Sequence, residues 1–122
     1  MELLECGAAD NANKTLHRGL TVTSFTMGSE KLYDYIDDNP AILHKSLSYT
    51  NNLSVISQNR KMVSINAALH VDLSGQCASE AVGTHQISGS GGQVDTGVGA
   101  QIAGGKSIIT LKSTRTRKDP AT

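Results

Sequence analysis

Val63–Leu73 alternates apolar and polar side chains through eleven residues without a break. Side chains two positions apart lie on the same face of a β-strand, so this period predicts a strand with one apolar face and one polar face. We expect the apolar face to be core and the polar face, which includes Ser64 and Asn66, to be exposed. Ser74-Gly75 predicts a two-residue hairpin loop that returns the chain through 76–82 beside this strand.

Shorter elements are predicted on both sides of this strand. Gly7 closes a short helix over 2–6, and 21–27 is a strand rich in β-branched residues. A helix is expected over 30–39, with Ser29 as its N-cap and Pro40 as its stop, and a last strand over 107–111. Together these elements predict an α/β fold, an open mixed sheet of about four or five strands with flanking helices.

Composition excludes several classes of function. The chain has 122 residues and a formal net charge of +0, so no global field attracts nucleic acid. Cys6 and Cys77 lie far apart with no zinc-ligand spacing, and neither a signal peptide nor a run of about eighteen apolar residues is present. We therefore expect a cytoplasmic protein with no metal, no nucleic-acid partner and no membrane segment.

Two clusters of ionisable residues leave alternatives open. Asp34, Asp37 and Asp38 share one face of the helix expected over 30–39, either as a carboxylate site for acid-base or metal chemistry or as a solvated face. His70 and Asp72 are at strand spacing on one face, either as a catalytic pair or as neighbours on a sheet surface.

Seven of the twelve glycines lie between Gly89 and Lys106. Such a segment is either a flexible turn or a loop that lets another molecule approach the main chain closely. It is not a nucleoside-triphosphate P-loop, because Ala100 stands at the first glycine position and a strand, not a helix, is expected after Lys106. A dinucleotide-binding fingerprint fails as well, because Val94 occupies its last position.

Four blocks of sequence in the same order resemble the acetyl-CoA hydrolase/transferase family. They are 28–40, 63–69 with 71–76, 86–95 and 104–109. The similarity is greatest to the carboxyl-terminal half of 4-hydroxybutyrate and butyryl-CoA:acetate CoA-transferases. It implies that residues 1–113 form a partial carboxyl-terminal CoA-transferase domain, NagB/RpiA-like in fold, and that 114–122 is a non-homologous polar tail.

The resemblance also implies a reaction and a site. Coenzyme A would pass between an acyl-CoA and a small carboxylate such as acetate, butyrate or 4-hydroxybutyrate, through a glutamyl-CoA thioester. The family places its 88–92 equivalent at the thioester, which implies coenzyme A contacts at Ser88, Gly89, Gly91 and Gly92, and a further contact at Asn66 on the polar strand face.

The resemblance assigns no catalytic residue to this chain. The family's nucleophilic glutamate precedes the segment that Met1 begins, and Glu80, near the glycine segment, is the one internal candidate to replace it. After Asp95 the family usually continues with an aromatic residue, valine and arginine, where this chain has Thr96-Gly97-Val98. Because acid-selecting residues would lie in the missing half, the accepting acid is not predicted.

Two hypotheses of function follow. The first is a CoA-transferase fragment that needs a separate amino-terminal half, or a homo-oligomer, for turnover. The second is an inactive truncated remnant or an interaction module that binds a carboxylate, a coenzyme A end or a partner subunit. Under either hypothesis the chain alone would expose a surface meant for the rest of the domain, so we expect poor solubility or self-association.

Overall fold

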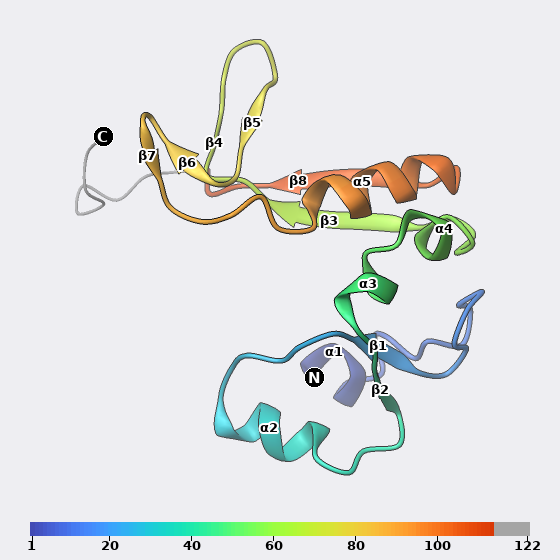
Figure 1. Cartoon of the computed structure of the whole chain (residues 1–122). Helices are drawn as coiled ribbons and strands as arrows, with labels where there is room; N and C mark the ends of the chain where they lie inside the picture. Colours follow the sequence, from blue (N-terminus) through green and yellow to red (C-terminus); the bar gives the residue numbers. More distant parts are fainter. Residues whose placement is uncertain (114–122) are drawn as a thin grey trace.

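The computed structural model describes residues 1–113 as two lobes (Figure 1). The amino-terminal lobe contains α1 (Glu2–Glu5), β1 (Thr21–Thr23), α2 (Glu30–Ile36) and β2 (Ile42–His44). Helix α3 (Leu47–Thr50) leads to the carboxy-terminal lobe, which contains α4 (Leu53–Ile56), β3 (Val63–Ala67), β4 (His70–Val71), β5 (Cys77–Ala78), β6 (Ala81–Val82), β7 (His85–Gln86), α5 (Gln93–Ile102) and β8 (Lys106–Thr110). The prediction for 114–122 lies outside the described residues.

In the amino-terminal lobe, β1 and β2 form a parallel pair with Thr21 opposite Ile42. Strand β1 ends at Thr23, earlier than predicted, and the Thr23 hydroxyl donates to the carbonyl of Phe25 at 2.8 Å. Helix α2 also ends early, at Ile36. Asp38 has a φ of +47° and the Asn39 side chain donates to the Tyr35 carbonyl at 2.9 Å, so the chain leaves the helix before Pro40.

The carboxy-terminal lobe is built on a parallel pair of β3 and β8, in which Val63 is opposite Lys106. Helix α5 packs on both strands and on α4. Gly99 of α5 lies against Ile56 of α4, and the buried apolar residues among those described are Ile56 and Ala100. The core is therefore small and lies between α4, α5 and the strand pair.

Helix α5 corrects the reading of the whole glycine segment as a loop. Glycine costs about 1 kcal/mol in a helix relative to alanine. Here Gly97 and Gly99 instead allow close contact with Ser107 and Ile56, so tertiary packing overrides propensity. The helix ends in a Schellman motif, in which the N–H of Gly104 (φ +67°) donates to Gln101 O at 3.0 Å and the N–H of Gly105 donates to Ala100 O at 2.8 Å.

The predicted eleven-residue strand is broken and its faces are reversed. Strand β3 ends at Ala67, and β4 covers only His70–Val71. Ser64, on the face expected to be exposed, is 3% exposed beneath α5, whereas Ile65, on the face expected to be core, is 66% exposed. Alternation shows that two faces differ, but it does not show which face the rest of the described chain covers.

The predicted hairpin is present with a longer loop. Val71 pairs with Cys77, so residues 72–76 form the connection in place of Ser74-Gly75 alone. The Asp72 N–H donates to Gln76 O at 3.0 Å, which closes this longer loop.

The expected single sheet of four or five strands is also wrong for the described residues. They form four separate two-stranded sheets, of which β1-β2 and β3-β8 are parallel and β4-β5 and β6-β7 are antiparallel. The α/β class holds, as a mixed arrangement of small open sheets with helices beside them. No helix within residues 1–113 has the length and apolar character needed to cross a membrane.

Candidate functional site

Residues 88–92 form an exposed loop between β7 and α5 (Figure 1). Ser88, Gly89 and Gly91 are exposed, whereas Gly92 is half-buried and is the N-cap of α5. Gly91 has a φ of +57°, a left-handed conformation that glycine adopts without strain. The predicted thioester loop is therefore a strand-to-helix connection with an accessible backbone.

The first end of this loop is anchored on Glu80. The N–H groups of Ile87 and Ser88 donate to the Glu80 carbonyl at 2.7 Å and 3.1 Å. The Ser88 hydroxyl donates to the carbonyl of Gly89 at 3.1 Å. Glu80 thus lies beside the predicted coenzyme A contacts, as its sequence position suggested, and its main chain fixes where the loop begins.

The second end of the loop lies against Asn51, at the C-cap of α3. A Cβ added at Gly92 would overlap the Asn51 Nδ2, so a larger residue at this position would require the Asn51 amide to move. The Asn51 Oδ1 accepts from the Thr50 hydroxyl at 3.1 Å, which turns the amide nitrogen toward the loop. Sequence reasoning missed Asn51, because an Asn-Asn pair after a short polar segment signals only a turn.

Asn66 is connected to the same end of the loop through Thr96. The Asn66 Nδ2 donates to the Ser64 hydroxyl at 2.8 Å and to the Thr96 hydroxyl at 3.1 Å. The Thr96 hydroxyl donates in turn to the Gly92 carbonyl at 3.0 Å. The structure therefore brings Asn66 and Gly92 into one hydrogen-bonded group, while Ser88 and Gly89 lie at the Glu80 end of the loop. Neither Ser64 nor Thr96 was predicted as a site residue, although Ser64 lies on the polar strand face and Thr96 stands where the family usually has an aromatic residue.

The loop ends at the positive end of a helix dipole. The first N–H groups of a helix have no intrahelical acceptor, and α5, with ten residues, begins directly after Gly92. Such groups can stabilise an oxyanion or a polarised thioester carbonyl. Asp95 in the first turn is stabilised by the same dipole. The arrangement is thus suited to stabilising negative charge that develops near the loop.

His70 and Asp72 are not brought together as a catalytic pair. The Asp72 carboxylate accepts from the Ser74 hydroxyl at 2.7 Å and from the Ser74 and Gln76 N–H groups at 2.9 Å each. The hydrogen bond from the Ser74 side chain, followed by that from the Gln76 backbone, lowers the pKa of Asp72. This carboxylate therefore closes the β4-β5 turn.

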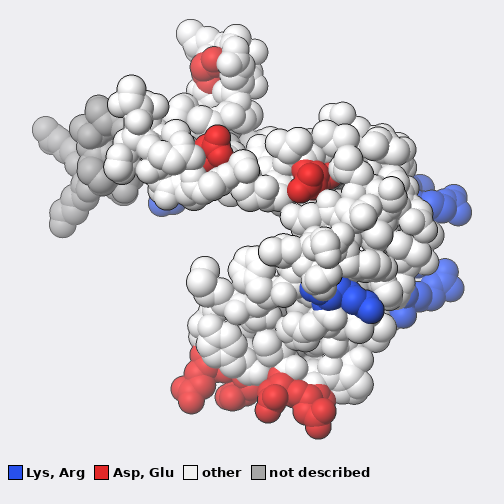
Figure 2. Space-filling view, viewed as in Figure 1, with Lys and Arg blue, Asp and Glu red and all other residues white. Residues whose placement is uncertain are grey.

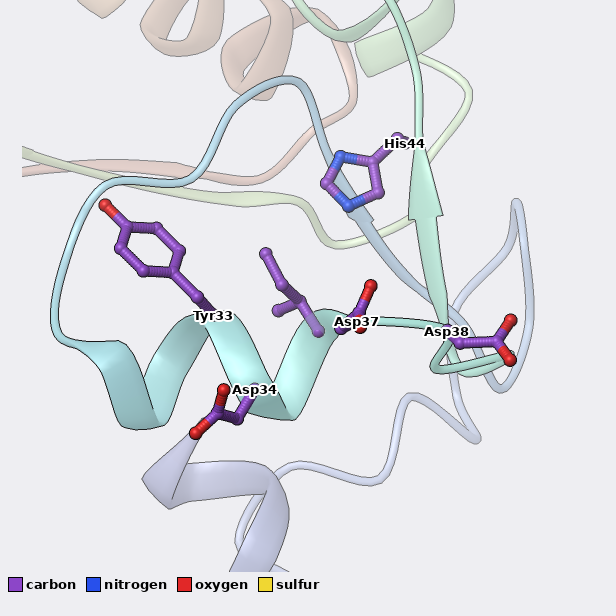
Figure 3. A pocket seen from close by; sticks show the side chains of 6 residues that line it. Tyr33, Asp34, Asp37, Asp38 and His44 are labelled. Carbon is purple, nitrogen blue, oxygen red and sulfur yellow. The ribbon is translucent and has the colours of Figure 1, made fainter.

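The acidic face of α2 borders a shallow pocket of about 530 Å³, and Figure 2 shows Asp and Glu gathered on this lobe. The lining residues are Tyr33, Asp34, Ile36, Asp37, Asp38 and His44. In Figure 3 the carboxylates of Asp34 and Asp38 point away from each other. Within residues 1–113 no group of three or more His, Cys, Asp or Glu side chains could hold a metal ion. The geometry favours a solvated acidic face.

Comparison with known proteins identifies the family. Residues 28–122 match the acetyl-CoA hydrolase/transferase C-terminal domain. The chain belongs to this family. The resemblance drawn from the four sequence blocks is therefore confirmed.

Several members of the acetyl-CoA hydrolase/transferase family are close in sequence or structure. The 4-hydroxybutyrate coenzyme A transferase of Clostridium kluyveri is 50% identical over 115 residues, which are 93% of this chain and 27% of that protein. The butyryl-CoA:acetate CoA-transferase of Anaerostipes caccae is 40% identical, over 97% of this chain and 27% of that protein. The crystal structure of RipA from Yersinia pestis matches with a TM-score of 0.85 and 44% identity, over 95% of this chain and 27% of that chain. The chain thus spans about a quarter of the length of the relatives it matches.

Proposed function

We propose that residues 1–113 form the acyl-CoA end of a CoA-transferase domain. The reaction would move coenzyme A between an acyl-CoA and a small carboxylate, with acetate, butyrate and 4-hydroxybutyrate as the candidate acids. The observation that carries this proposal is the exposed 88–92 loop, whose first end is hydrogen-bonded to the Glu80 carbonyl and whose second end is the N-terminus of α5. Ser88, Gly89, Gly91, Gly92 and Asn66 are the proposed coenzyme A contacts.

The first half of the reaction has two carbonyl steps, and the acceptor acid reverses them in the second half to regenerate the glutamate. A glutamate carboxylate attacks the acyl-CoA carbonyl, the thiolate of coenzyme A leaves, and a mixed anhydride forms. The thiolate then attacks the glutamyl carbonyl of the anhydride, which releases the first acid and leaves a glutamyl-CoA thioester. Negative charge develops on a carbonyl oxygen in each step, and backbone N–H groups of the loop and of the first turn of α5 would stabilise it. The glutamate would come from a segment outside these residues.

An exposed apolar surface supports the proposal that other segments complete the domain. Parallel sheets are usually covered on both faces. In the β3-β8 pair, α5 covers one face. Val63, Ile65 and Ile108 lie on the opposite face and are 46%, 66% and 41% exposed. The proposed partner is the part of a CoA-transferase that this chain does not span, or alternatively a second copy of this chain.

A second candidate function is a binding module without turnover. It is favoured by the exposed backbone of the loop together with the small share, 27%, of the Clostridium kluyveri relative that the chain spans. In this case the loop would retain affinity for a coenzyme A end or a carboxylate, and no covalent step would follow.

One experiment separates these functions. The full chain is mixed with butyryl-CoA and acetate, alone and together with the portion of the Clostridium kluyveri relative that it does not cover. We expect binding without a covalent adduct for the chain alone, and coenzyme A transfer to acetate for the mixture. Binding without transfer in the mixture would favour the binding module, and an adduct on Glu80 would contradict the placement of the nucleophile outside these residues.

A serine pair provides the matched control for binding. We expect Ser88→Ala to weaken butyryl-CoA binding, whereas Ser48→Ala, at an exposed serine of α3, should leave it unchanged. Equal affinity of the Ser88→Ala variant and the unaltered chain would remove Ser88 from the site.

A further inference from the structure

The Thr96 hydroxyl uses its full hydrogen-bonding capacity in one place. A threonine hydroxyl has one donor and two acceptor positions. Thr96 accepts from Ser64 Oγ and from Asn66 Nδ2, each at 3.1 Å, and donates to Gly92 O at 3.0 Å, with Gln93 O at 3.2 Å as a second acceptor. The hydroxyl thus connects strand β3 to the first turn of α5.

The hydrogen bonds among Asn66, Ser64 and Thr96 run in one direction, from the strand toward the loop. Asn66 Nδ2 has two hydrogens, and it donates to Ser64 and Thr96. Ser64, which is 3% exposed, donates to Thr96, and Thr96 donates to the last residue of the 88–92 loop. Because Nδ2 faces this group, Oδ1 of Asn66 lies on the other side of the amide, where it can accept from a ligand N–H or O–H.

We infer that Thr96 is a positioning residue, whose hydroxyl holds Gly92 and Asn66 in fixed relation at the thioester loop. The inference rests on the proposed function for its consequence in acyl-CoA binding. The hydrogen-bond geometry around Thr96 is independent of the proposed function. Removing the hydroxyl leaves a buried serine without its acceptor and a half-buried amide without one of its two acceptors. The Gly92 carbonyl loses its hydroxyl donor and keeps the Thr96 N–H.

Amide hydrogen exchange of the full chain tests the geometry without any ligand. The Thr96 N–H, bonded to Gly92 O at 3.0 Å, reports the first turn of α5, and the Gly105 N–H, bonded to Ala100 O at 2.8 Å, reports its far end. Thr96→Val keeps the shape and removes the hydroxyl. We expect exchange at position 96, corrected for intrinsic rate, to become about tenfold faster, with Gly105 little changed. Thr96→Ser should restore protection, and Thr84→Val, at an exposed turn, should change neither amide.

Butyryl-CoA binding forms the second arm. We expect Thr96→Val to weaken binding about tenfold and Thr96→Ser to restore it. An unchanged exchange rate at position 96 in Thr96→Val would overturn the inference. So would an exchange rate at Gly105 that rises as much as the rate at position 96, with no restored protection in Thr96→Ser. Failure of the unaltered chain to bind butyryl-CoA would count against the proposed function alone. If Thr96→Val does not fold, Ser64→Ala removes one donor to Thr96, and an unchanged exchange rate at position 96 would then overturn the inference.

Discussion

Gly105 lies directly against the carbonyl of Met62, where β8 begins beside β3. A Cβ at position 105 would overlap the Met62 oxygen, and the next N–H, of Lys106, donates to that same oxygen at 2.8 Å. The parallel pair under the candidate site therefore starts at a position that has no room for a side chain.

We expect Gly105→Ala to lower the free energy of unfolding by about 2–3 kcal/mol, because the added methyl group must displace backbone and cannot be relieved by a rotamer change. Urea denaturation measures the effect. The control is Gly89→Ala, which meets nothing within 4 Å and should change stability by less than about 0.5 kcal/mol. Equal stability of the two variants would mean that β3 and β8 do not approach as described.

Gly104 should be replaceable only at a conformational cost. It ends α5 with a φ of +67° and has open space around its Cβ position, so the cost of alanine is backbone strain without a clash. We expect Gly104→Ala to destabilise the chain by about 1 kcal/mol and Gly104→Asn by less, since asparagine tolerates this conformation. Thermal unfolding compares the two. A larger loss for asparagine than for alanine would contradict the left-handed end of the helix.

The β4-β5 turn should loosen at low pH. Hydrogen bonds from Ser74 and Gln76 lower the pKa of Asp72, so its ionised form is favoured in the folded turn. The stabilisation is complete above the ordinary pKa of 3.8 and is lost as the pH falls through the lowered pKa. We expect the Ser74 and Gln76 amide resonances to titrate below pH 3.8. In Asp72→Asn, which keeps an acceptor without a charge, they should not. Titration above that value would contradict the hydrogen bonds.

The exposed face of the β3-β8 pair should cause self-association of the chain alone. Ile65 and Leu3 are both 66% exposed, but Ile65 lies on the strand pair whereas Leu3 is on α1 in the other lobe. We expect Ile65→Thr to shift sedimentation toward monomer with little change in stability, because the side chain packs against little. Leu3→Thr should have no such effect. A stable monomer of the unaltered chain would contradict a role for this face in association.

Several elements could be predicted from local sequence because local chemistry determines them. Gly7, with a φ of +75°, ends α1 as expected, and β8 lies within one residue of its predicted position. The ends of β1 and α2 were placed too late, because side chains of Thr23 and Asn39 bond to nearby backbone in ways that propensity does not show.

The sequence predicted the loop of the candidate site but not the residues that hold the loop in place. Residues 88–92 were identified through resemblance to the family, and the loop lies next to Glu80 as expected. Thr96 and Asn51 were missed, because their importance depends on contacts between segments far apart in the chain: Thr96 meets β3, and Asn51 meets Gly92.

The sequence by itself determined the family, the α/β class and the place of the glycine-rich loop, because these depend on residue identity and order. The tertiary structure decided that Ser64 is buried and Ile65 exposed, and that half of the glycine segment is α5. The reason is physical. An alternating pattern distinguishes two faces without naming the one that a helix covers, and glycine disfavours a helix unless close packing, as at Gly99 and Ile56, offsets that cost.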